Sequence, residues 1–216
     1  MNVTRCWYLI LLILYGSLST ISLAHGSAAS YPQIVRVSYV EGDVRISRGK
    51  ENEKATGAAW EKAVADLPVD SGFNLVTGAG RAEIEFEDTS TVYLGENSLL
   101  AFNNLQTEGN VPHAEIALLS GAATVHARLT VAGDSFVLTT PTNALSLKYP
   151  DDSYVRVNSY LDGMRVTPQE NMVSHLPGDQ TIDGQGQNVE LWRERPDSTG
   201  RGGRSGRVHR VGPLGG

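Results

Sequence analysis

The chain has 216 residues, of which 40% are hydrophobic and 19% are charged, and its formal net charge at pH 7 is −6. This length fits a single domain. Acidic side chains dominate the middle of the chain, where residues 30–189 hold 11 basic and 21 acidic residues. A surface of that sign repels phosphate groups, so the folded part is not expected to bind nucleic acid.

Residues 1–29 have the pattern of an export signal. Arg5 is the only charge before an apolar run from Leu9 to Leu14. Small residues follow at Ser22-Leu23-Ala24 and at Ser27-Ala28-Ala29, which predicts cleavage after Ala24 or Ala29. The alternative is a retained anchor, which needs about 20 mainly apolar residues. Gly, Ser and Thr interrupt the run too early for that, so we expect a periplasmic or secreted protein that is exported through the Sec pathway and does not span the membrane.

The single cysteine, Cys6, lies inside this predicted signal. Cleavage would leave a mature chain with no thiol. Neither a disulfide nor a thiolate metal site can then form. The stability of the exported protein is therefore expected to come from its apolar core.

From Ile34 onward, short alternations of apolar and polar residues are separated by Gly, Asp and Asn. Turns are predicted at Gly42-Asp43 and at Gly78-Ala79-Gly80, and a hairpin is predicted around Ser120-Gly121. Strands recur about every eight to twelve residues with no helical period between them, which is typical of an all-β protein. We expect a β-roll or sandwich of many short, mainly antiparallel strands over residues 33–191.

The C-terminal segment, residues 192–216, has a different composition. Residues 190–216 hold six Arg and three acidic residues, and Gly separates most of these Arg residues. Few apolar residues are available to pack there, so we predict a disordered basic tail. Such a tail could bind an anionic lipid, lipopolysaccharide or a nucleic acid, but a flexible tail without a partner is the favoured interpretation.

One predicted strand places three carboxylates on a single face. Glu83, Glu85 and Glu87 alternate with the apolar residues Ala82, Ile84 and Phe86. Paired carboxylates can hydrolyse a glycan, and a hydrolase that uses Glu83, Glu85 and Asp88 is one hypothesis. A solvated sheet face is the favoured interpretation. We find no calcium loop, no His-Glu-x-x-His and no Gly-x-Ser-x-Gly, so no catalytic residue, metal or cofactor is predicted.

Trp60 is the remaining candidate for recognition. An exposed tryptophan could stack on a sugar, whereas a buried one would close an end of the core, which is the favoured interpretation. Trp60, Glu83, Glu85 and Glu87 together form the interaction surface that the sequence predicts.

Several stretches resemble the FecR domain family. They are Val40-Glu41-Gly42-Asp43-Val44-Arg45-Ile46, Leu75-Val76-Thr77-Gly78, Gly80-Arg81-Ala82-Glu83-Ile84 and Asp88-Thr89-Ser90-Thr91-Val92-Tyr93-Leu94-Gly95-Glu96-Asn97-Ser98. The resemblance covers residues 35–148, and residues 149–191 resemble an extension found in exported FecR-like proteins. It implies an envelope β-domain that acts through protein contacts and has no catalytic residues.

This sequence differs from the FecR regulators at its N-terminal end. A FecR regulator carries a cytoplasmic segment that contacts a sigma factor, whereas only eight residues precede the apolar run here. We therefore expect an exported, non-enzymatic module for protein interaction, sensing or regulation, whose partner is another envelope protein. The alternative is a module that binds cell-wall glycan or another polysaccharide.

Overall fold

A computed structural model describes residues 29–49, 60–170, 173–176, 180–183, 188–192 and 207–211. Every regular element in these ranges is a β-strand, and nearly all pairings are antiparallel, which confirms the all-β prediction. None of the described residues belongs to a helix that is long and apolar enough to cross a membrane. The predicted export signal lies outside the described residues, except for Ala29.

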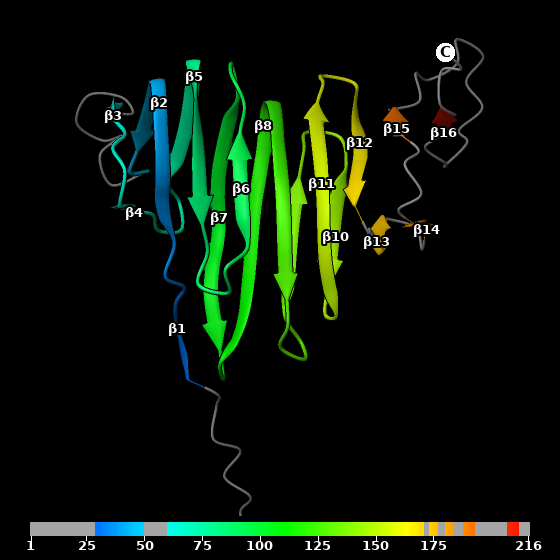
Figure 1. Cartoon of the computed structure of the whole chain (residues 1–216), viewed down its shortest axis with the longest axis horizontal. Coiled ribbons are helices and arrows are strands. Elements are labelled where there is room, and N and C mark those ends of the chain that lie inside the picture. Colours follow the sequence, from blue (N-terminus) through cyan, green and yellow to red (C-terminus); the bar gives the residue numbers. More distant parts are fainter. Residues whose placement is uncertain are drawn as a thin grey trace, which may run out of the picture.

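The strands form one hydrogen-bonded sheet that folds over into two layers (Figure 1). They are β1 (Ser30–Pro32), β2 (Arg36–Ser47), β3 (Glu61–Lys62), β4 (Leu67–Pro68), β5 (Asn74–Glu85), β6 (Thr91–Leu94), β7 (Leu99–Glu108), β8 (Val111–Leu129), β9 (Ser135–Thr139), β10 (Ala144–Lys148), β11 (Asp151–Ser159), β12 (Gly163–Glu170), β13 (Val173–Leu176), β14 (Gln180–Asp183), β15 (Asn188–Trp192) and β16 (Arg207–Val211).

Three long strands, β2, β5 and β8, belong to both layers. The start of β5 pairs with β7, whereas its end pairs with β6. In the same way, the first part of β8 lies between β7 and β9, with β9 parallel to it, and the second part lies between β6 and β11. We name each layer after the strand that lies between β5 and β8 in it. These are the β6 layer and the β7 layer.

Each layer continues sideways from these shared strands. The β6 layer contains the first part of β2, the second parts of β5 and β8, and β6, β11, β12, β15 and β16. The β7 layer contains the second part of β2, the first parts of β5 and β8, and β7, β9 and β10. The residues predicted as an extension, 149–191, thus supply β11, β12 and β15 to the same sheet.

Glycines allow the shared strands to bend between the layers. Gly42 and Gly121 adopt positive φ angles of 75° and 84°, a region that side chains with a Cβ disfavour. Gly42 is the register partner of Gly80, and a Cβ on Gly80 would lie 2.7 Å from Asp43 N. The sequence predicted chain-reversing turns at these glycines. That prediction was wrong, because each strand continues through its glycine and only changes direction.

The apolar core fills the space between the layers. Phe86, at the end of β5, meets Phe136 of β9 edge to face with ring centroids 5.2 Å apart. Thr140, which follows β9, and Met164 of β12 also meet, with Thr140 Oγ1 lying 3.8 Å from Met164 Sδ. Alternate residues of each strand point inward, as the two-residue period of a strand requires. Their opposite neighbours are left on the outer faces.

Part of the segment predicted to be disordered is a strand. Arg207–Val211 forms β16, which pairs antiparallel with β15, so that Val208 lies opposite Leu191. A strand can pair with a free sheet edge through backbone hydrogen bonds alone, without burying apolar side chains. The composition of this segment therefore did not reveal the strand. The other residues of the predicted tail, 193–206 and 212–216, lie outside the described residues.

Candidate functional site

A straight row of side chains crosses the outer face of the β6 layer. The strand register makes its members successive neighbours on five adjacent strands. They are Tyr39 on β2, Glu83 on β5, Tyr93 on β6, Thr124 on β8 and Arg156 on β11. Neighbouring strands lie about 4.8 Å apart, so the row places these different side chains at regular intervals.

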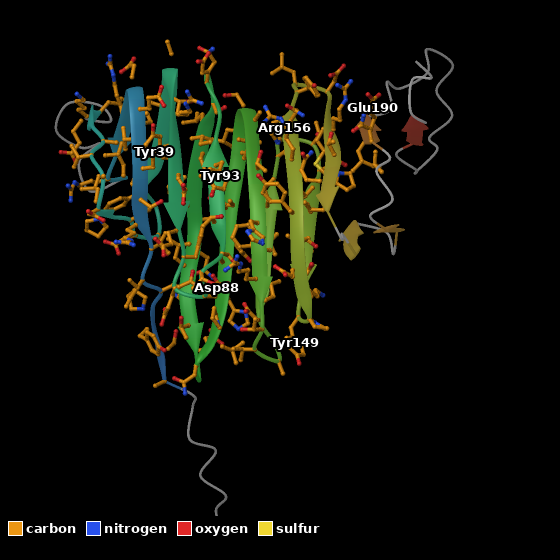
Figure 2. The ribbon with its side chains drawn as sticks, in the orientation of Figure 1. Tyr39, Asp88, Tyr93, Tyr149, Arg156 and Glu190 are labelled. Atoms are coloured by element: carbon orange, nitrogen blue, oxygen red, sulfur yellow. The ribbon has the colours of Figure 1, made fainter. Side chains whose placement is uncertain are left out.

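The row lines an open hollow with a volume of about 680 Å³. Tyr39 and Tyr93 are 47% and 43% exposed. The hydrogen-bonded pair Glu41 and Arg81 closes one side of the hollow. Figure 2 shows Tyr39, Tyr93 and Arg156 spread across the same face of the sheet.

Hydrogen bonds hold the β2 side of the hollow in place. The Tyr39 hydroxyl donates to Glu41 Oε2 at 2.7 Å, and Arg81 donates to both Glu41 oxygens at 2.9 and 3.1 Å. These bonds, first that from Arg81 and then that from Tyr39, hold the pKa of Glu41 below its usual value. The same bond to Glu41 raises the pKa of the Tyr39 hydroxyl. At neutral pH the Tyr39 hydroxyl therefore donates to an ionised Glu41.

Two charged side chains of the row lack a counter-ion among the described residues. Within that part of the chain, neither the Glu83 carboxylate nor the Arg156 guanidinium forms a hydrogen bond or an ion pair. Ser38 Oγ donates a hydrogen bond at 3.2 Å to the backbone carbonyl of Glu83 and not to its carboxylate. Both side chains border the hollow. A bound molecule could therefore neutralise both of them without breaking an existing interaction.

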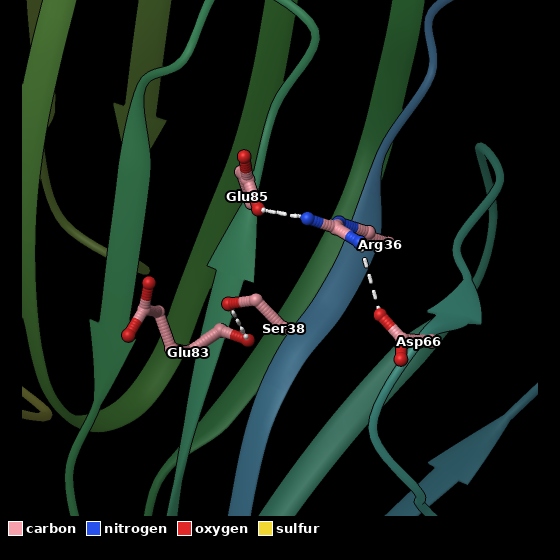
Figure 3. A network of polar contacts seen from close by, with 5 residues as sticks. All are labelled: Arg36, Ser38, Asp66, Glu83 and Glu85. Atoms are coloured by element: carbon pink, nitrogen blue, oxygen red, sulfur yellow. Dashed lines mark hydrogen bonds and ion pairs between the residues drawn. The ribbon is translucent and has the colours of Figure 1, made fainter.

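The next charged residues on this face are already paired (Figure 3). Arg36 donates to Glu85 Oε2 at 2.8 Å and to Asp66 Oδ1 at 2.9 Å. The hydrogen bond to Glu85 is the main cause that raises the pKa of Arg36. At the other end of the layer, Arg165 and Glu190 form a similar ion pair at 2.7 Å. Among the charged residues that line the hollow, Glu83 and Arg156 are thus the two available to a ligand, since Glu41 and Arg81 are paired with each other.

The structure separates the surface residues that the sequence grouped together. Glu83 and Glu85 share the outer face of β5, as predicted, but only Glu83 lines the hollow. Glu87 lies beyond the end of β5, where Oε2 accepts hydrogen bonds from Ile34 N and Thr107 Oγ1, both at 3.2 Å.

Trp60 lies elsewhere on the molecule. It immediately precedes β3, which pairs with Arg45 and Ile46 of β2, beyond the bend at Gly42. Its side chain is 41% exposed. The interpretation of Trp60 as a buried end of the core was therefore wrong, and Trp60 does not border the hollow with Glu83.

A second group of carboxylates lies among the turns at one end of the layers. Asp88, in the turn between β5 and β6, accepts a hydrogen bond from Ser90 N at 2.8 Å, and burial raises its pKa. Asp134, just before β9, is only 2% exposed, and neither of its oxygens has a well-aligned hydrogen-bond donor among the described residues. Burial and then the nearby Asp88 raise the pKa of Asp134 to about 6. Within the described residues, no cluster of three potential ligands could hold a metal ion.

The sequence did not single out Tyr39, Tyr93, Thr124 or Arg156. Each occupies a polar-side position of its strand, which the alternation does indicate. Their common row, however, depends on which strands are neighbours, and periodicity carries no information about that. The long-range pairing of β6 with β8 and of β8 with β11 brings the row together.

Comparison with solved structures finds limited likeness. Two crystal structures of a proposed anti-sigma factor from Parabacteroides distasonis ATCC 8503 align with TM-scores of 0.44 and 0.45 and sequence identities of 10% and 12%. Each alignment covers 63% of this chain and 57% of the solved chain. No curated protein sequence matches this chain.

Comparison with family models gives a specific match. Residues 73–146 match the FecR protein family. The matched segment runs from the start of β5 into β10 and includes Glu83, Tyr93 and Thr124 of the row. It begins later than the resemblance over residues 35–148 that the sequence indicated. Residues 73–146 are therefore similar to the FecR protein family, and this matched segment forms the centre of both layers.

Proposed function

We propose that this chain is a non-enzymatic regulatory module of the bacterial cell envelope that binds another protein through the outer face of its β6 layer. The FecR match supports a role in regulation or sensing. The hollow supports the location of the binding surface, because it combines exposed aromatic rings with unpaired charges.

The single observation that carries the proposal is the pair of uncompensated charges, Glu83 and Arg156, on a rigid row. Both side chains project from strands that are hydrogen-bonded on each side. Little conformational entropy is therefore lost when a partner fixes the backbone around them. Exposed aromatic rings and arginine are also the residue types enriched in protein interfaces.

Export is part of this proposal and has its own test. We propose that residues 1–29 direct the chain through the Sec pathway and that cleavage follows Ala24 or Ala29. Intact-mass analysis of the protein recovered from the periplasm or medium should give a chain that begins at His25 or Ser30. A full-length chain retained in the membrane fraction would contradict cleavage and favour an anchor.

Partner binding is tested by affinity capture from the envelope fraction of the source bacterium, followed by reconstitution. We expect the chain to capture a specific envelope protein, and the purified protein to bind this chain directly in solution. A heat-denatured sample of the chain serves as the control. Recovery of the same proteins on both samples would contradict the proposal.

A polysaccharide is the second candidate ligand, favoured by the two exposed tyrosines, Tyr39 and Tyr93. An aromatic ring offers an apolar face on which the C–H face of a sugar can stack. Co-sedimentation with peptidoglycan or with soluble polysaccharides tests this alternative. Binding that is lost in the Tyr39→Ala and Tyr93→Ala variants would support it, and sedimentation equal to that of a denatured control would exclude it.

A further inference from the structure

The interval between the two uncompensated charges of the hollow is set by the strand register. Glu83 lies on β5 and Arg156 on β11, and two strands, β6 and β8, separate them. Three steps between neighbouring strands, each of about 4.8 Å, place their Cα atoms about 14 Å apart. A ligand that satisfies both must carry a cation and an anion at a matching interval.

An extended peptide provides this interval in a simple way. Successive residues of an extended chain rise by about 3.3 Å, and residues i, i+2 and i+4 point to the same side. The span from i to i+4 is therefore about 13 Å. We propose that the hollow binds an extended segment of a partner protein with the pattern basic–x–apolar–x–acidic, which crosses the strands of the β6 layer.

In this arrangement each of the three facing residues meets one part of the row. The basic side chain at i lies on the Glu83 carboxylate, and the acidic side chain at i+4 lies on the Arg156 guanidinium. The apolar side chain at i+2 covers the exposed ring of Tyr93, with Thr124 beside it. This assignment deepens the proposed function and rests on it, since it assumes that the hollow binds a protein.

Neighbouring charges do not compete for this segment. Arg36 and Arg81 are held by Glu85 and Glu41, so a ligand that bound either would have to break an ion pair. Among the charged residues that line the hollow, charge complementarity is therefore confined to Glu83 and Arg156. That restriction fixes the direction of the segment, with its basic residue towards β5 and its acidic residue towards β11.

Strand addition and helix docking fit the site less well. The strands β5, β6, β8 and β11 are each paired on both sides, so they offer no free edge to a partner strand. In a helix, residues i and i+4 are only about 6 Å apart. A helical ligand would need its two charges roughly nine residues apart to reach both Glu83 and Arg156.

Binding of short synthetic peptides to the exported protein tests the proposal. The first peptide, Gly-Ser-Lys-Ser-Leu-Ser-Glu-Ser-Gly, has the predicted spacing, and the second has the same composition with Lys and Glu adjacent. Fluorescence anisotropy at low salt should show saturable binding of the first, weaker binding of the second, and a loss of affinity as salt rises. No saturable binding of the first peptide at concentrations up to about 1 mM would overturn the proposal.

Variants assign the two charges. Glu83→Gln and Arg156→Gln should each weaken binding of the first peptide by about 1.5- to fivefold, the range expected of exposed ion pairs. Glu115→Gln is the matched control for charge loss, because Glu115 is an exposed residue on the first part of β8, which belongs to the β7 layer. Equal weakening by Glu115→Gln would contradict a specific site.

A charge exchange gives the sharpest result. The double variant Glu83→Arg/Arg156→Glu should bind a peptide with Lys and Glu interchanged and should lose the first peptide. If the exchanged variant still prefers the first peptide, the proposed direction and site are wrong. Loss of polysaccharide binding, rather than of peptide binding, in the same variant would replace a protein segment with a glycan as the ligand.

The captured envelope protein separates this inference from the proposed function. If the protein binds the native chain but not the Glu83→Gln/Arg156→Gln double variant, both stand. If it binds both chains equally, the module still binds a partner but not at the hollow, and only the inference fails. If no protein binds either chain, the proposed function itself fails.

Discussion

Ser98 occupies the space that a side chain on Gly121 would need. A Cβ on Gly121 would lie 2.6 Å from Ser98 Cα and 2.7 Å from Asn97 O. The Ser98 hydroxyl also accepts a hydrogen bond from Ala122 N at 2.9 Å, which ties the β6–β7 turn to the bend in β8. The bend that carries β8 from one layer to the other thus depends on a residue without a Cβ.

Gly121→Ala is therefore expected to destabilise the protein strongly. The substitution combines a disfavoured positive φ with a contact to backbone atoms that cannot move aside easily. We expect the free energy of unfolding to fall by about 2–4 kcal/mol. Urea denaturation followed by tryptophan fluorescence measures this change.

Gly72→Ala is the matched control for this substitution. Gly72 also has a positive φ, 89°, but no atom of the described residues lies within 4 Å of the position that a Cβ would take there. Only the backbone strain remains, which costs about 1–2 kcal/mol. Equal losses in the two variants would show that close packing at the β8 bend contributes nothing.

Asp134 should make the stability of the protein depend on pH. Its pKa is raised from 3.8 to about 6, so between these values the folded chain holds a proton that the unfolded chain has released. Stability then falls as the pH rises through this window. Asp134→Asn should raise the free energy of unfolding at pH 7.5 by at most about 3 kcal/mol, and should have little effect below pH 4. Thermal unfolding at several pH values measures the difference.

The exposed carboxylate Asp162, in the turn between β11 and β12, provides the comparison for that experiment. Asp162→Asn also removes one carboxylate, but from the surface, and its melting temperature at pH 7.5 should stay close to that of the native chain. If Asp134→Asn instead destabilises the protein at pH 7.5, the buried carboxylate has a stabilising partner, such as a cation, and the expectation is wrong.

The contact between Phe86 and Phe136 should couple the two layers energetically. Phe136 is fully buried, and its replacement by Ala is expected to cost about 3–5 kcal/mol. A double-mutant cycle with Phe86→Ala should show a coupling energy of about 0.5–1.5 kcal/mol for the edge-to-face pair. Additive losses would mean that the rings pack independently. Leu variants at both positions complete the cycle if the Ala variants do not fold.

Removal of the unpaired charges should leave stability unchanged. Glu83→Gln and Arg156→Gln break no interaction among the described residues, so their melting temperatures should match that of the native chain. Arg36→Gln, in contrast, leaves Glu85 and Asp66 without their shared partner. Its melting temperature should fall at low salt and recover towards the native value at high salt, because salt screens exposed ion pairs.

The sequence predicted the period of the strands better than their ends. The alternation of Ala123, Val125, Ala127 and Leu129 with polar residues indicates that these four share one face, and all four are buried. The hairpin predicted at Gly121, just before these residues, was wrong, because β8 continues through this glycine. A glycine suits a tight turn and a bent strand equally well. Both conformations need a positive φ, and no local pattern distinguishes them.

The candidate site was only partly predictable. Glu83 was identified because a strand with three alternating carboxylates is conspicuous in the sequence. Arg156 was not, because nothing local marks an arginine whose counter-ion is missing. An unpaired charge is a property of the assembled face, and it becomes visible only when the partners of Arg36 and Arg81 are known.

The shared strand β8 has a consequence for biosynthesis. Its first part completes the pairing of β7, and its second part completes the pairing of β6. A nascent chain released only as far as Ser120 would leave β6 with an open edge. The nascent chain can therefore cover the edge of β7 before that of β6, and both edges are covered only once the second part of β8 has emerged.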